Sequence, residues 1–172
     1  RVIDELLAND ITPYVTLFHW DLPQALPGGW QSRDTAPAFA EYAGFIARQL
    51  SDRVHHFMTT NEFTCFTDLG YGSGKFAPGL QLPAREVNQL RHHGLLAQGL
   101  GLPAIRANAK GAVQVGLAEN ARVFAPVIED NANIEAALRA TRMENGPCLP
   151  TGLEWKCPVF YLEQGGADAP KV

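Results

Sequence analysis

The sequence has 172 residues, of which 46% are hydrophobic and 19% charged, and this is the size and composition of about one globular domain. Its net charge of −4 provides no basic face for nucleic acid or anionic lipid, and no apolar stretch approaches the roughly 18 residues that a membrane helix needs. The three cysteines have neither zinc-site spacing nor the density of a disulfide framework, which favours a reducing compartment, and we predict the cytoplasm.

Hydrophobic periodicity predicts helices that alternate with strands. Residues 1–9 have the pattern of the end of a helix, without an initiator Met or a capping residue before it. A cap at Asp34 or Thr35 and a first-turn Pro37 mark the start of the next helix, and Pro83 marks the start of a third. The predicted elements are a helix over 1–9, a strand over 11–18, a helix over 34–51, a strand over 53–63, a glycine-rich loop over 64–80, a helix over 83–108, a strand over 111–120 and a helix over 131–143.

Polar residues gather where each predicted strand ends. They are His19, Trp20 and Asp21 after the first strand, Asn61 and Glu62 at the end of the second, and Glu119 and Asn120 at the end of the third. In parallel βα units the loops after the carboxyl ends of the strands form the active site. A closed barrel needs eight strands and about 250 residues, so three strands predict either a small open α/β sheet or a piece of a barrel.

Two motifs in this order resemble glycoside hydrolase family 1, the β-glucosidase family. The first is "TLFHWDLPQAL" followed by "GGW", and the second is a strand that ends in "TTNE". The stretches "GKFAPG" and "VGLAENARVFAPVIEDNANIEAALRATR" extend the resemblance from residue 1 to about residue 143. The resemblance implies a fragment of a (β/α)8 TIM barrel with about its third to fifth strands, so that residues 1–172 would form a partial catalytic domain, incomplete at both ends.

The resemblance also implies the site residues of a retaining β-glycosidase. Glu62 would be the general acid/base, Asn61 would bind the sugar 2-hydroxyl, and His19 and Trp20 would line the pocket of the non-reducing sugar. Phe63 departs from the family, which usually has Pro at this position. The expected partner is a small-molecule β-glycoside, such as a β-glucoside or β-galactoside, and neither a cofactor nor a metal is implied.

A retaining glycosidase needs a second carboxylate, about 5 to 5.5 Å from the acid, as its nucleophile. "MENG" at 143–146 matches three letters of the family nucleophile motif, but it ends a predicted helix and follows Glu62 too soon for three further βα units. We therefore interpret Glu144 as a decoy, place the nucleophile beyond residue 172, and expect this chain alone to be inactive. Residues 144–159 lose both periodicity and family likeness, which predicts an irregular or divergent segment.

Two other interpretations stay open at this point. The chain could be a non-catalytic truncated remnant that acts as a binding or interaction protein, or an unrelated small α/β enzyme that uses Glu62 with His19. The aromatic residues Trp30, Phe66 and Tyr71 fit equally well as walls of a leaving-group subsite or as packing. A three-stranded fragment would leave two strand edges unpaired, so oligomerisation is also expected.

Overall fold

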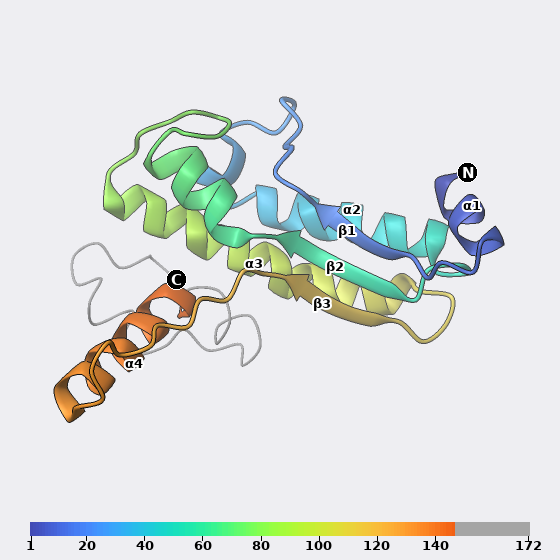
Figure 1. The fold of residues 1–172 in the computed structure, drawn as a ribbon. Coiled ribbons are helices and arrows are strands. Elements are labelled where there is room, and N and C mark those ends of the chain that lie inside the picture. Colours follow the sequence, from blue (N-terminus) through green and yellow to red (C-terminus); the bar gives the residue numbers. More distant parts are fainter. Residues whose placement is uncertain (147–172) are drawn as a thin grey trace.

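Three parallel strands form one sheet in the order β1, β2, β3 in the computed structural model, which describes residues 1–146 (Figure 1). The strands are β1 (Tyr14–Phe18), β2 (His56–Asn61) and β3 (Gln114–Ala118). The helices are α1 (Val2–Ala8), α2 (Thr35–Leu50), α3 (Ala84–Asn108) and α4 (Asn131–Asn145), with short helical segments η1 (Gly29–Gln31) and η2 (Cys65–Gly72). The predicted order of helices and strands is confirmed, and the strands are shorter than predicted by a few residues at either end.

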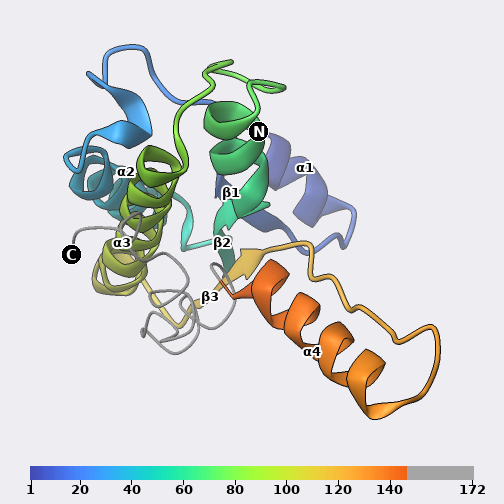
Figure 2. The same ribbon diagram turned by 90° about the vertical axis from the view of Figure 1, so that its left-hand side faces the viewer.

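One face of the sheet is covered by α2 and α3, which lie side by side in both views (Figures 1 and 2). Val15, Phe57 and Val115 are paired across the three strands, so they point to the same face. Phe57 is completely buried, and this row therefore faces the helices. On the opposite face the rings of Tyr14 and His56 stack with their centroids 4.2 Å apart.

Close contact between α2 and α3 depends on two glycines. A Cβ added at Gly101 of α3 would lie 2.8 Å from the ring of Phe39, and one at Gly44 of α2 would lie 2.9 Å from the Asn108 side chain. The helix starts differ slightly from the prediction. Asp34 precedes α2 without a side-chain capping bond, and Pro83 lies just before the first turn of α3.

The segment that follows β2 corrects one prediction. Residues 64–80 were expected to form a glycine-rich loop, but Cys65–Gly72 forms η2, a short helix of π type. Phe66 and Tyr71 on this helix are buried, so tertiary packing stabilises a helical conformation that the local glycine content does not favour. Gly70 permits the packing, because a Cβ there would lie 2.6 Å from the carbonyl oxygen of Ala77.

The last described helix, α4, lies apart from α2 and α3 and points away from the sheet (Figure 2). Its N-cap Asp130 accepts a hydrogen bond from the backbone N–H of Asn133, and Ala137 is its only buried residue. Glu144 and Asn145 still belong to this helix, whereas residues 147–159 lie outside the described residues, so the irregular segment over 144–159 stays a prediction. Within residues 1–146 the longest helices are too short or too polar to cross a lipid bilayer.

Candidate active site

The carboxyl end of β1 places Trp20 against the end of β2. Trp20 has a φ of +75°, a left-handed backbone conformation that is unusual for a bulky residue. Its indole N–H donates a hydrogen bond to the carbonyl oxygen of Asn61 at 3.0 Å, and its ring stacks on Phe76 with centroids 5.3 Å apart. The indole therefore ties the ends of the two strands together.

Asn61, the last residue of β2, also meets His19 from the end of β1. The Asn61 Nδ2 atom lies 3.4 Å from the His19 Nε2 atom, and the His19 ring contacts the Trp20 ring edge-on at 5.0 Å. His19 is exposed, while Trp20 and Asn61 are half-buried. The structure thus brings the four residues implied by the resemblance, with Glu62 next along the chain, to one edge of the sheet.

Glu62 has the most constrained side chain at this edge. Its φ is +45°, and its carboxyl group is held at both oxygens. Asn120 donates its side-chain N–H to the Glu62 Oε1 atom at 2.7 Å, and the Cys65 thiol donates to the Oε2 atom at 3.3 Å. Strained backbone conformations persist where the surroundings enforce them, and they cluster at functional sites. The carboxyl group is therefore presented in a fixed orientation.

Glu119 is a second carboxyl group at this edge, and sequence analysis assigned it no role. Its Oε1 atom accepts a hydrogen bond from the backbone N–H of Phe63 at 2.8 Å. Burial raises the pKa of Glu119 to about 7; the Phe63 N–H opposes this increase, and the negative charge of Glu62 adds to it. The signal for Glu119 and Asn120 was already present, because Glu119 directly follows β3 as Glu62 directly follows β2, and Asn120 is the next residue.

Cys65 is the other neighbour of Glu62 that sequence reasoning left without a role. Burial raises the pKa of its thiol to about 11, and its hydrogen bond to Glu62 acts in the same direction. A thiol with so high a pKa is almost entirely protonated near neutral pH and is a poor nucleophile. Cys65 is therefore a hydrogen-bond donor to Glu62.

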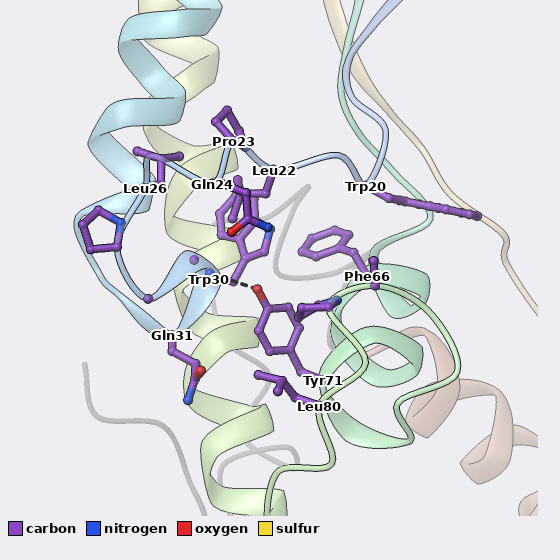
Figure 3. A pocket seen from close by; sticks show the side chains of 15 residues that line it. Trp20, Leu22, Pro23, Gln24, Leu26, Trp30, Gln31, Phe66, Tyr71 and Leu80 are labelled. Carbon is purple, nitrogen blue, oxygen red and sulfur yellow. Dashed lines mark hydrogen bonds between the residues drawn. The ribbon is translucent and has the colours of Figure 1, made fainter.

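A pocket of about 360 Å³ lies between the loop after β1 and the segment around η2, and Trp20 is the one residue of the strand-end group that lines it (Figure 3). Trp20, Trp30, Phe66 and Tyr71 all line it. The Tyr71 hydroxyl accepts a hydrogen bond from the Trp30 backbone N–H at 3.3 Å, which Figure 3 marks. Trp30, Phe66 and Tyr71 are also buried members of the core, so they form the floor of the pocket and contribute to packing at the same time.

Glu144 lies elsewhere, in the last turn of α4. Its Oε1 atom forms an ion pair with the Nη1 atom of Arg122 at 2.8 Å. The residue does not follow a strand, which agrees with its interpretation as a decoy. Among the residues that the structure describes, no three His, Cys, Asp or Glu side chains are grouped so that they could hold a metal ion.

The sequence profile described as "Glycosyl hydrolase family 1" matches residues 1–153. The chain belongs to this family. The family 1 chain is 42% identical over 168 residues to "Thermostable beta-glucosidase B" of Thermobispora bispora, a match that covers 95% of this chain and 33% of the relative. It is 37% identical over 174 residues to a "Beta-glucosidase" of Agrobacterium sp., covering all of this chain and 38% of the relative. The family predicted from the strand-end motifs is thus confirmed.

Solved structures give the same result for the fold. The virulence factor SghA of Agrobacterium tumefaciens superposes with a TM-score of 0.89 at 37% identity, covering all of this chain and 38% of that one. A mutant of a rice β-glucosidase in a covalent complex with Glc superposes with a TM-score of 0.91 at 33% identity, covering 99% of this chain and 39% of that one. The family 1 chain therefore spans about a third of the length of the relatives it matches, as a fragment of their barrel fold would.

Proposed function

We propose that this chain supplies the acid/base half of a retaining β-glucosidase active site, with Glu62 as the general acid and base. The observation that carries the proposal is the fixed carboxyl group of Glu62, held at both oxygens at the carboxyl edge of a parallel sheet. In the first step its proton would go to the glycosidic oxygen as the bond to the anomeric carbon breaks and a nucleophilic carboxylate forms a covalent bond to that carbon. In the second step it would take a proton from the water that releases the sugar.

The neighbours of Glu62 suit the binding of a sugar. Asn61 has both an N–H donor and a carbonyl acceptor for a hydroxyl group, and His19 adds a second polar group 3.4 Å away. Trp20 offers an apolar ring that also lines the pocket of about 360 Å³. We infer that these three residues bind the non-reducing sugar of a β-glucoside or a related β-glycoside.

The nucleophile would be a carboxylate outside residues 1–172. Glu144 is paired with Arg122 on a helix, and Glu119 is partly buried and bound to the Phe63 amide. General acid assistance alone contributes about a hundred- to ten-thousandfold, whereas enzymes accelerate such reactions by about a millionfold or more. Residues 1–172 alone are therefore expected to show no measurable turnover.

The substitution Glu62→Gln in the intact natural protein tests the proposal. It keeps the size of the side chain but removes the proton, so hydrolysis of an alkyl glucoside should slow by about a hundredfold or more. An aryl glucoside with a nitrophenolate leaving group needs no proton for its first step and should keep most of its rate in that step.

Steady-state and burst kinetics on both substrates provide the measurement. Equal slowing of the two substrates would remove Glu62 from the acid role. An intact natural protein with a mass near 18.7 kDa and no turnover would instead identify a non-catalytic remnant.

A further inference from the structure

The backbone on both sides of Glu62 is held by the end of β3. The Glu62 N–H donates to the carbonyl oxygen of Ala118 at 2.7 Å, and the next N–H along the chain, that of Phe63, donates to the Glu119 carboxyl group at 2.8 Å. These two bonds fix the peptide groups that flank the Glu62 Cα atom, which carries the left-handed φ of +45°. Because L-residues disfavour that conformation, it needs such external restraints.

The backbone N–H of Phe63 needs a hydrogen-bond acceptor, and the Glu119 carboxyl group provides one. The side chain of Phe63 is only 1% exposed, and its N–H points to the partly buried Glu119 carboxyl group. A buried backbone N–H without a hydrogen-bond partner destabilises the folded state. Proline at this position would have no N–H and would also restrict the backbone conformation of the preceding residue, Glu62. Phe63 thus introduces a buried N–H that a proline would lack, and the Glu119 carboxyl group accepts its hydrogen bond.

We propose that Glu119 is a positioning residue for Glu62, holding the Glu62 backbone through the Phe63 amide so that the Glu62 carboxyl group meets Asn120 and Cys65. The inference rests on the proposed acid/base role of Glu62. The partial burial of Glu119 supports the positioning role, because a carboxyl group that contributed only to solubility would be exposed to solvent. The required property is an oxygen acceptor, which a protonated or amidated side chain also provides.

The test compares Glu119→Ala with Glu119→Gln in the intact natural protein, on the alkyl glucoside and on the nitrophenyl glucoside. Glu119→Ala removes the acceptor, so alkyl glucoside hydrolysis should slow about ten- to a hundredfold more than nitrophenyl glucoside hydrolysis, as for a misplaced general acid. Glu119→Gln keeps an acceptor and should lose less than about threefold on either substrate. The exposed Glu135→Ala on α4 is the matched control, with both rates unchanged.

A double-substitution cycle keeps the inference testable if Glu119→Ala also lowers stability. Phe63→Pro removes the N–H donor, so in that background Glu119→Ala should slow alkyl glucoside hydrolysis by less than a further factor of about three. The packing lost at Phe63 cancels, because both proteins in this comparison carry Phe63→Pro. Equal slowing of both substrates by Glu119→Ala, a Gln variant as slow as the Ala variant, or additive effects in the cycle would each overturn the positioning role. Glu62→Gln separates the two proposals: if it slows both substrates equally, the acid/base assignment itself fails.

Discussion

The middle of the described chain and its C-terminal part differ in how completely they bury their apolar side chains. All buried members of the main hydrophobic cluster lie between Leu17 and Ile105. After β3, in contrast, Val123 and Val127 are 84% and 98% exposed, and α4 buries only Ala137. The first two βα units, β1 with α2 and β2 with α3, therefore share one buried core. The third unit exposes apolar side chains that a neighbouring element of a barrel would cover.

The candidate site lies across this boundary. Glu62 belongs to the well-packed part, but the groups that hold its backbone and its Oε1 atom come from Ala118, Glu119 and Asn120 at the end of β3. The position of the proposed acid thus depends on the strand with the less complete packing. The contrast teaches that the well-packed part carries the candidate site residues, while part of their support comes from the less completely packed end of β3.

The largest expected effect contrasts Phe57→Ala with Leu138→Ala in residues 1–172. Phe57 is fully buried between the sheet and its helices, so its loss should lower the free energy of unfolding by about 3 to 5 kcal/mol. Leu138 is 50% exposed on α4, and its loss should change the free energy by about 0.5 kcal/mol or less. Urea unfolding measures both. Similar losses at the two positions would show that α4 is packed as tightly as the sheet.

Sequence patterns located elements in both parts of the chain, because α4 was predicted over 131–143, whereas the helix that was missed, η2, lies in the well-packed part. Apolar periodicity located β1, α2, β2 and α3 because each buries a regular row of side chains against the others. The helix at Cys65–Gly72 was missed because its stability comes from the burial of Phe66 and Tyr71 against distant elements, which local composition does not encode.

The site was predicted only in part, for a related reason. His19, Trp20, Asn61 and Glu62 stand in recognisable motifs, and the structure brings them together at one edge. The contacts of Glu119 and Asn120 with the Glu62 region join residues more than 50 positions apart in sequence, so only the pairing of β2 with β3 reveals them. Their roles in catalysis, like those of the motif residues, stay proposals.

An intermediate effect concerns Glu119 and pH. Its pKa is raised to about 7 from the ordinary 4.5, so the folded state binds the proton more tightly than the unfolded state. The contribution of Glu119 to the free energy of unfolding is therefore fully present below about pH 4.5 and is lost as the pH rises through about 7. The Gln side chain of Glu119→Gln cannot ionise. The thermal midpoint of the variant, relative to that of the parent chain, should therefore rise as the pH increases from about 5 to about 8. A difference that does not change with pH would contradict the raised pKa.

The smallest expected effect is that of Glu144→Ala. Exposed ion pairs such as Glu144 with Arg122 contribute about 0 to 1 kcal/mol, so stability should change little. Turnover by the intact natural protein should be unchanged, and a fluorinated deoxyglucoside that traps the covalent intermediate should label no peptide containing Glu144. Mass spectrometry of the digested protein makes the measurement. A sugar found on Glu144 would identify it as the nucleophile and place the full carboxyl pair in this chain.

The confinement of the buried cluster to Leu17–Ile105 also bears on the order in which the protein acquires structure during synthesis. A ribosome delivers the chain from its N-terminus at about 5 to 20 residues per second, and folding units form as they emerge. The side chains of this cluster are all available once α3 is complete, before β3 has been made. The first two strands can therefore close their interface with α2 and α3 cotranslationally, whereas Val123 and Val127, which emerge later, are not part of that interface.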